Sequence, residues 1–269
     1  MRYNYPMPLQ PHSPAWYDRL STLQFGYYYP WRSILPSLNG EATYLELVSQ
    51  HLFPEADVLD SGCGHGEVAL DIASHCRSIL AYDRVAAYIQ LAKEAAQKRE
   101  ITNVIFVCAD SSAEANGGKP RIPAESASFD LLISRRGPLN WIEDVRRVAR
   151  PGAVLIQLNP VSTPIPIWND ELPEQLRIHP QLIGSMREVV EQRLAQGGLA
   201  LHSCWTFDVP EIFPDPEQLY VFLSWGCTPE EVPAFTEVRA ELQALFFNHA
   251  GPDGLALRRG RFLWKAVVS

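Results

Sequence analysis

The chain has 269 residues, of which 46% are hydrophobic and 20% charged, and its formal net charge is -8. This composition is ordinary for a soluble globular protein and excludes a largely disordered chain. The excess of acidic residues disfavours a large nucleic-acid interface, because phosphate contacts need clustered lysine and arginine.

The first 54 residues precede the first predicted strand. Prolines within the first fourteen residues predict an irregular arm. An aromatic-rich segment follows from Trp16 to about Leu52, and it includes Tyr28 and Trp31. Such rings mostly pack in a core, but their faces can also contact a cation. The segment is expected to end in a helix through Tyr44, Leu45, Leu47 and Val48.

A glycine-rich turn follows the first predicted strand, Val58–Ser61. The chain reads D-S-G-C-G-H-G-E from Asp60 to Glu67, an acid followed by three glycines at alternate positions. Glycine allows a sharp turn and lets a ligand approach the backbone closely. A helix with small apolar residues on one face begins directly afterwards. Strand, turn and helix start together predict a nucleotide-binding corner.

The charges around this turn indicate the kind of ligand. The dinucleotide fingerprint G-x-G-x-x-G needs a third glycine at the position of Glu67. Carboxylates on both sides of the loop, at Asp60 and Glu67, repel a phosphate and favour a cationic ligand. S-adenosylmethionine carries a sulfonium and an ammonium group and no phosphate. A structural glycine turn in another α/β protein is the alternative.

Strands and helices then alternate, which predicts a mostly parallel sheet with helices on both faces. The next strands are expected at Ile79–Tyr82, Val104–Cys108, Leu131–Ser134 and Val154–Leu158. Helical patterns between them run through Val85, Ile89, Ala92 and Ala96, and through Trp141, Val145 and Val148. Pro151 and Gly152 are expected to end the second of these helices. Later elements are a helix near Ile183–Gln196, a strand near Ala200–Phe207, a helix through Phe235, Val238, Leu242, Leu245 and Phe246, and a last strand at Arg261–Val268.

Polar residues stand at the carboxyl ends of the second and third strands, where ligands bind in open α/β sheets. Asp83, followed by Arg84, is placed to accept hydrogen bonds from ribose hydroxyls. A solvated aspartate is the alternative for Asp83. Asp110, with Ser111 beside it, is the corresponding acid after the third strand, and the alternative there is a helix N-cap.

The fourth strand ends in Ser134-Arg135-Arg136-Gly137-Pro138. Guanidinium groups match the geometry of carboxylate and phosphate, so Arg135 and Arg136 could receive an anionic substrate. The alternative is a structural salt bridge to Asp83 or a neighbouring acid. The segment lacks the N-P-P-Y or D-P-P-Y tetrad of enzymes that methylate amino groups of nucleic acids, which disfavours that activity.

The pattern D-x-G-x-G-x-G from Asp60, with Asp83 and Asp110 at the next two strand ends, resembles the class I S-adenosylmethionine-dependent methyltransferases, with a domain of the type 11/25 kind. The resemblance covers residues 55 to 160 well and the remainder loosely. It implies an α/β fold with a doubly wound, seven-stranded, mostly parallel sheet of Rossmann-like type, whose last strand runs antiparallel between its neighbours. It also implies an N-terminal helical lid and a helical insertion before the last strand.

The resemblance further implies one methyltransferase domain over residues 1–269. Its parts are an arm and lid at 1–54, a cofactor-binding core at 55–160, and a substrate-side half at 161–269 with the insertion at about 214–248. The residues expected to bind the cofactor S-adenosylmethionine are Asp60, Gly62, Cys63, Gly64, Gly66, Asp83, Arg84, Asp110, Ser111 and Ser134. The candidates for substrate contact are Tyr28, Trp31, Arg135 and Arg136.

The expected reaction is in-line transfer of a methyl group to a small-molecule nucleophile. Such a transfer can rest on positioning and desolvation, so no catalytic residue is assigned. One alternative is an RNA methyltransferase, which would need a basic surface near Arg135 and Arg136. Another is a protein that binds S-adenosylmethionine without catalysis. A nicotinamide dehydrogenase is disfavoured by Glu67.

Five cysteines without a C-x-x-C pair predict neither a disulfide framework nor a metal site. No apolar stretch approaches the length of a membrane span, and the first residues lack the apolar core of a signal peptide. We therefore expect a cytoplasmic protein without membrane contact. The oligomeric state is not predicted.

Overall fold

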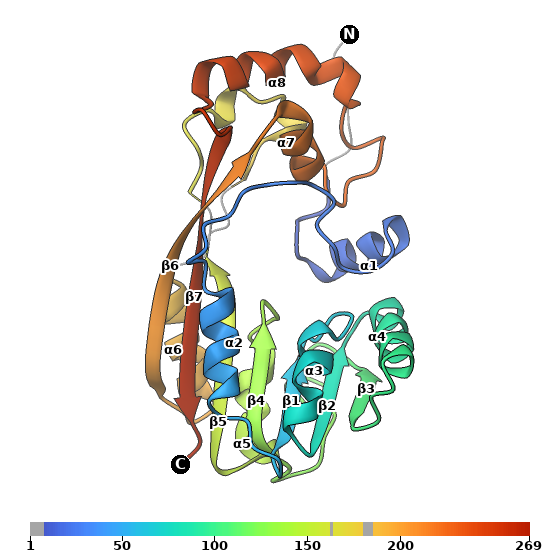
Figure 1. The fold of residues 1–269 in the computed structure, drawn as a ribbon, viewed down its shortest axis with the longest axis vertical. Coiled ribbons are helices and arrows are strands. Elements are labelled where there is room, and N and C mark those ends of the chain that lie inside the picture. The colour runs from blue at the N-terminus through green and yellow to red at the C-terminus, as the bar shows by residue number, and fades with distance from the viewer. Residues whose placement is uncertain (1–7, 162–163, 180–184) are drawn as a thin grey trace. The chain divides into compact units, whose positions relative to one another are not determined.

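The computed structural model describes residues 8–161, 164–179 and 185–269. One sheet contains seven strands in the order β3-β2-β1-β4-β5-β7-β6 (Figure 1). Strands β1 to β5 pair in parallel, and β7 runs antiparallel. The predicted α/β class and sheet are thus confirmed. The strand bounds are β1 (Asp57–Ser61), β2 (Ser78–Asp83), β3 (Val104–Cys108), β4 (Phe129–Arg135), β5 (Ala149–Val161), β6 (Leu201–Phe213) and β7 (Leu255–Val267).

The chain divides into two compact units, which we call the sheet unit and the helical unit. The sheet unit comprises residues 40–161, 183–207 and 261–269, and the helical unit comprises residues 1–39, 162–182 and 208–260. The prediction of one domain over the whole chain stays a prediction. The helix bounds are α1 (Pro14–Leu23), α2 (Glu41–Ser49), α3 (Glu67–Ile72), α4 (Ala86–Lys98), α5 (Val145–Val148), α6 (Met186–Gln196), α7 (Pro216–Leu223) and α8 (Phe235–His249).

In the sheet unit, helices cover both faces of the sheet. In Figure 1, α2, α3 and α4 lie in front of the strands, and α5 and α6 lie behind them. The core contains fully buried side chains from neighbouring strands, such as Leu59, Leu132 and Leu155. All five residues of β1 are buried, as a central strand with both faces covered requires. This packing fixes the carboxyl ends of β1, β2 and β4 beside one another.

The bounds of the first four strands agree with the prediction to within two residues at each end. The fifth strand differs from its prediction, because it spans Ala149–Val161 instead of Val154–Leu158. Helix α5 ends at Val148, and β5 already begins at Ala149, so Pro151 and Gly152 lie inside the strand instead of ending a helix. The register shifts here, and Gly152 has a φ of 83°, so the residues form an irregularity that only glycine adopts at low cost.

The helical unit contains α1, α7 and α8. Helix α1 was not predicted, although Ser13 and Pro14 are a helix-start signal: the Ser13 side chain accepts the Trp16 N–H at 3.2 Å, and proline occupies the first turn. Helices α7 and α8 occupy the range where helices were expected before the last strand. Helix α6, in the sheet unit, begins at Met186, and the start predicted for it, Ile183, lies outside the described residues. None of the described helices is long and apolar enough to span a membrane.

A charged network fixes the start of β1. The Asp57 carboxylate accepts hydrogen bonds from Arg77 Nε at 2.9 Å, from Arg150 Nη2 at 2.7 Å and from Ser78 Oγ at 2.7 Å. The Asp57 N–H in turn donates to Asp130 at 2.9 Å. The hydrogen bond from Arg77, against the opposing effect of burial, holds the pKa of Asp57 well below its ordinary value. The network therefore stabilises the fold while Asp57 is ionised.

We expect Asp57→Asn to lower the free energy of unfolding by about 2 kcal/mol at neutral pH, because the mostly buried Asp57 side chain loses its charge-assisted hydrogen bonds to the partly buried Arg150 and the exposed Arg77. The pKa of Asp57 is depressed in the folded state, so its contribution is present above the unfolded value of about 4 and is lost as the pH falls towards the folded value. Urea unfolding of both proteins at several pH values checks this. A stability difference between Asp57→Asn and the wild type that does not decrease at acidic pH would contradict this role of Asp57.

Candidate functional site

The glycine loop joins β1 to α3. Gly62, Gly64 and Gly66 have φ angles of 68°, 54° and 81°, the left-handed region that other residues adopt only with strain. A Cβ atom at Gly66 would lie 2.6 Å from the Phe106 ring. The N–H groups of Gly62 and Cys63 both donate to the Tyr82 carbonyl, at 2.9 and 3.0 Å, which ties the loop to β2. The predicted glycines are thus required by the shape of the loop.

Asp83, at the end of β2, holds the loop from the other side. Its Oδ2 accepts the Gly64 N–H at 2.9 Å and its Oδ1 accepts the Val85 N–H at 2.9 Å. Burial raises the pKa of Asp83, while these backbone hydrogen bonds lower it. Each carboxylate oxygen has a second lone pair, so both can still accept from a ligand. The ribose contact of Asp83 stays a prediction, and the loop contact is an added structural role.

Asp60, at the end of β1, is almost fully buried. Burial raises its pKa from the ordinary 3.8 to about 7, the nearby charge of Asp83 raises it as well, and Arg135 lowers it. The carboxylates of Asp60 and Asp83 thus lie near each other at the ends of β1 and β2, beside the glycine loop, where water solvates them poorly. A cationic ligand would reduce the repulsion between these carboxylates, and an anionic ligand would increase the repulsion at this place.

Four buried hydroxyl groups form hydrogen bonds next to the loop. Ser61 Oγ is 2.7 Å from the Tyr82 hydroxyl, which donates to Ser111 Oγ at 3.0 Å. Ser134 Oγ donates to the Ser61 carbonyl at 2.7 Å. The side chains of Ser111 and Ser134, which we predicted to bind the cofactor, are therefore engaged in hydrogen bonds that join β1, β2, β4 and the segment after β3.

We expect Tyr82→Phe to lower the free energy of unfolding by about 1–2 kcal/mol, because two buried serine hydroxyl groups lose their common partner. The ring and its packing are unchanged, so the loss reports the hydrogen bonds alone. Urea unfolding checks the value. An unchanged stability would show that the network does not stabilise the fold.

Asp110 and Arg84 form a second polar pair, at the ends of β3 and β2. Asp110 accepts the Ser112 N–H at 2.8 Å, and its other oxygen lies 3.5 Å from Arg84 Nε. Burial opposes ionisation of Asp110, but the Ser112 hydrogen bonds and the Arg84 charge outweigh it and lower the pKa. A turn follows instead of a helix, so Asp110 is not a helix N-cap. The adenine contact of Asp110 stays a prediction.

At the end of β4, arginine side chains meet carboxylates from two helices. Arg135 pairs with Glu67, the first residue of α3, and lies 3.8 Å from Glu41, the first residue of α2. Glu41 also lies 3.6 Å from Arg136 and 3.0 Å from Arg261 of β7. We call these five residues the arginine cluster. The expected salt bridge to a neighbouring acid is present, but its partners are Glu41 and Glu67 and not Asp83.

Tyr44 lies one turn after Glu41 on α2 and was predicted only as a helix residue. It is fully buried, and within the part of the chain that the structure describes its hydroxyl has no hydrogen-bond partner. Burial and the charges of Asp60 and Glu41 raise its pKa, and Arg135 lowers it. The sequence signal that could have identified it is the spacing of Glu41 and Tyr44, three apart on the helix before β1, which places both on one face.

The other two substrate candidates lie in the helical unit. Trp31 is buried, donates from Nε1 to Glu211 at 2.8 Å, and packs at 5.2 Å against Trp225 between ring centres. Tyr28 is exposed. Trp31 therefore has a packing role within its unit. A lid role of this segment stays a prediction.

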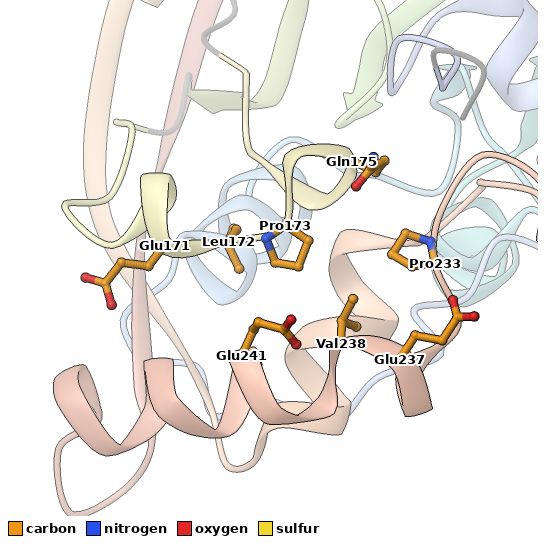
Figure 2. Close-up of a pocket in the computed structure, with 8 residues that line it drawn as sticks. All are labelled: Glu171, Leu172, Pro173, Gln175, Pro233, Glu237, Val238 and Glu241. Atoms are coloured by element: carbon orange, nitrogen blue, oxygen red, sulfur yellow. The ribbon is translucent and has the colours of Figure 1, made fainter. Parts of the chain in front are cut away.

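A cavity of about 490 Å³ lies in the helical unit between the segment around Glu171 and helix α8 (Figure 2). Two of its acidic side chains have partners within the helical unit: Glu171 lies 2.6 Å from His249, and Glu237 accepts the Ala234 N–H at 3.0 Å. None of the predicted site residues lines it, so we assign it no role. The lining residues are Glu171, Leu172, Pro173, Gln175, Pro233, Glu237, Val238 and Glu241.

Comparisons with known proteins agree with this geometry. Residues 58–152 match a family described as "Methyltransferase domain". Over 105 residues the chain is 45% identical to a 2-heptyl-1-hydroxyquinolin-4(1H)-one methyltransferase of Mycobacteroides abscessus, an alignment that covers 38% of this chain and 45% of that protein. The chain spans about half the length of the curated relatives that it matches.

Solved structures show the same fold over almost the whole chain. A functionally unknown protein from Deinococcus radiodurans R1 is 24% identical with a TM-score of 0.64, and the match covers 93% of this chain and 97% of the other. An S-adenosylmethionine-dependent methyltransferase from Thiobacillus denitrificans, solved with S-adenosyl-L-homocysteine, is 14% identical with a TM-score of 0.52, and the match covers 96% and 99% of the two chains. At these identities the likeness concerns the fold alone. Residues 58–152 thus match a methyltransferase domain, and the strand order is that of the class I, Rossmann-like methyltransferase fold.

Proposed function

We propose that this protein transfers the methyl group of S-adenosylmethionine to a small-molecule nucleophile. The observation that carries the proposal is the glycine loop between two poorly solvated carboxylates, Asp60 and Asp83. A sulfonium and an ammonium group fit that charge, and a pyrophosphate does not. The hydroxyquinolinone methyltransferase of Mycobacteroides abscessus, named for a small molecule, supports the substrate class.

The residues present fit the cofactor. The loop from Asp60 to Gly66 would take its amino-acid end, Asp83 its ribose and Asp110 its adenine. The bound cofactor supplies an electrophilic methyl group whose leaving group departs as a neutral thioether. The protein then needs to hold nucleophile, methyl carbon and sulfur in line and to exclude water. Asp60 and Asp83 contribute by binding the cationic donor in a fixed orientation.

Calorimetry with S-adenosylhomocysteine and with NAD tests the cofactor. We expect binding of S-adenosylhomocysteine and none of NAD, and the reverse would reject the proposal. Release of S-adenosylhomocysteine from S-adenosylmethionine, measured over a panel of small nucleophiles and over RNA, then tests the reaction. Binding without turnover of any acceptor would favour a non-catalytic binding protein.

The arrangement of the arginines bears on the RNA alternative. Arg135 and Arg136 are paired with Glu41 and Glu67 and are about three-quarters buried. They therefore do not form an open basic surface of the kind that phosphate backbones require. A small acceptor is favoured over RNA for this reason.

A further inference from the structure

The Tyr44 hydroxyl is a buried hydrogen-bond donor that the fold does not use. Tyr44 is fully buried, and across residues 8–161, 164–179 and 185–269 its hydroxyl has no hydrogen-bond partner. Tyr82, which is also buried, differs because its hydroxyl bonds to two serine side chains. A buried polar group without a partner lowers the stability of the folded protein, and such groups are rare. The retention of this hydroxyl therefore calls for an explanation in its surroundings.

The pairing of β1 with β4 places Asp60 on the face of the sheet that α2 covers. In this pairing Asp60 stands opposite Ile133, and the side chains of such paired residues point to the same face. Arg135 follows Ile133 by two positions, so its side chain lies on that face too, where it comes within 3.8 Å of Glu41 on α2. Tyr44 shares one side of α2 with Glu41, three positions earlier. Asp60 and Tyr44 are therefore neighbours on the face that α2 covers (Figure 1).

Asp60 is the acid that requires a donor when it ionises. Its side chain is almost fully buried, and burial raises its pKa to about 7 against the lowering effect of Arg135. Burial also raises the pKa of Tyr44, and of the charges that act on this hydroxyl, that of Asp60 has the largest effect. The hydroxyl thus keeps its proton at neutral pH and stays a donor. Because a hydrogen bond to a carboxylate is about twice as strong as one between neutral groups, ionisation of Asp60 favours a hydrogen bond from Tyr44.

We infer that the Tyr44 hydroxyl donates a hydrogen bond to the Asp60 carboxylate once Asp60 has lost its proton, and that Tyr44 thereby acts as a positioning residue of the cofactor site. This role rests on the proposed function, in which ionised Asp60 faces the cationic end of S-adenosylmethionine. The proton of Asp60 passes to solvent, and Tyr44 keeps its own. Without the hydroxyl, Asp60 ionises only at a higher pH, so the pH range in which the protein binds the cofactor becomes narrower.

Other charged and titratable groups surround this pair, and they are the same in every variant described below. The Cys63 thiol keeps its proton, because burial raises its pKa. The remaining groups therefore affect each protein alike, and a comparison between variants isolates the contact of Tyr44 with Asp60. Among the described residues, these groups are Glu41 of α2 with its partner Arg261 of β7, Cys63 of the glycine loop, Asp83 of β2 and Arg135 of β4.

A double-mutant cycle on stability tests the hydrogen bond without any ligand. Urea unfolding of the wild type, Tyr44→Phe, Asp60→Asn and the double variant is measured at about pH 5 and about pH 9. At about pH 5 Asp60 holds its proton, so Tyr44→Phe should leave the unfolding equilibrium constant unchanged or lower it. At about pH 9 it should raise this constant about tenfold, because ionised Asp60 loses its donor. With asparagine at position 60, Tyr44→Phe should have the same effect at both pH values.

Calorimetry with S-adenosylmethionine tests the consequence for the cofactor. Tyr44→Phe should bind it as tightly as the wild type at about pH 9 and about tenfold more weakly at about pH 6, because binding then requires release of a proton that the variant holds more tightly. Titration of the ligand affects both proteins alike. Tyr220→Phe is the matched control, since it removes a hydroxyl that donates to the Pro233 carbonyl at 2.9 Å in the helical unit. Its affinity should follow the wild-type pH dependence.

The outcomes separate this role from the proposed function. An effect of Tyr44→Phe on stability that does not change with pH, or that changes equally with aspartate and with asparagine at position 60, would show a merely structural role and overturn the inference. Normal binding of S-adenosylmethionine with either of these results would leave the proposed function standing. The expected cycle in a wild type that does not bind S-adenosylmethionine at any pH would reject the proposed function and, with it, the positioning role of Tyr44.

Discussion

Replacing Asp60 with asparagine is expected to stabilise the free protein above neutral pH and to weaken its affinity for S-adenosylmethionine. Burial raises the pKa of Asp60 from 3.8 to about 7, so the folded protein resists ionisation of this group. Each pKa unit corresponds to about 1.4 kcal/mol, which gives roughly 4 kcal/mol when Asp60 is fully ionised. Buried sites relax and admit water, which reduces this cost. We therefore expect Asp60→Asn to raise the free energy of unfolding by about 2–4 kcal/mol at about pH 8.

The sign of the pH dependence follows from proton binding. Between pH 3.8 and about 7 the folded state holds the Asp60 proton more tightly than the unfolded state does, so the contribution of Asp60 to stability falls as the pH rises through this window. The stability difference between Asp60→Asn and the wild type should therefore be large at about pH 8 and vanish at about pH 4. Urea unfolding at both pH values measures it.

Asp57→Asn is the matched control, because Asp57 lies on the same strand and its pKa is shifted in the opposite direction. That variant should lose stability at neutral pH, whereas Asp60→Asn should gain it. Equal changes in the free energy of unfolding for the two substitutions would contradict the unfavourable burial of the Asp60 charge.

The affinity for S-adenosylmethionine should change in the opposite direction to stability. The cationic donor favours the ionised form of Asp60, so Asp60→Asn should weaken binding about tenfold or more at about pH 8. For the wild type, affinity should fall as the pH decreases below about 7, because binding then requires release of the Asp60 proton. Calorimetry in buffers of different ionisation enthalpy measures both the affinity and the number of protons released on binding. A wild-type affinity that does not change with pH would contradict the contact.

The strands of the cofactor half could be predicted from the sequence because their signal is local. Val58 to Ser61 in the buried β1 and Val104 to Cys108 in the edge strand β3 are short, largely apolar runs, and such runs predict strands. The glycine loop and the acids after it are also local features, and their spacing carries the resemblance to methyltransferases, which the match of residues 58–152 to a methyltransferase domain supports. The structure adds that Asp83 supports the loop itself.

The extended ends of β6 and β7 could not be predicted, because charged residues interrupt their patterns. Asp208 and Glu211 on β6 face Arg258 and Arg259 on β7, and each acid pairs with one arginine across the strands. A single sequence does not show such pairing. Arg135 and Arg136 were named from the sequence, but their neighbours Glu41 and Arg261 were missed for the same reason, since these two residues are 220 positions apart in the sequence and meet only in the fold.

Replacing Asp83 with alanine should cause the largest loss of cofactor affinity in this protein. The substitution removes the acceptor of the Gly64 and Val85 N–H groups, and it removes the carboxylate predicted to bind the ribose. Hydrogen bonds to a charged group contribute about 1.5–3 kcal/mol each, so the affinity for S-adenosylhomocysteine should fall by about a hundredfold or more. Asp83→Asn keeps the shape of the side chain and one acceptor oxygen, so we expect its affinity for S-adenosylhomocysteine to fall by only about tenfold.

A second ligand separates the ribose contact from the loop contact. The 2′,3′-dideoxy analogue of S-adenosylhomocysteine lacks the hydroxyl groups that Asp83 would accept. If Asp83 binds the ribose, the wild type should prefer S-adenosylhomocysteine to the analogue by about tenfold or more, and Asp83→Ala should show almost no preference, as in a double-mutant cycle. If Asp83 acts only on the loop, both proteins will show the same preference. That result would remove Asp83 from the ribose site while leaving its hydrogen bonds to Gly64 and Val85 as the reason for the loss of affinity.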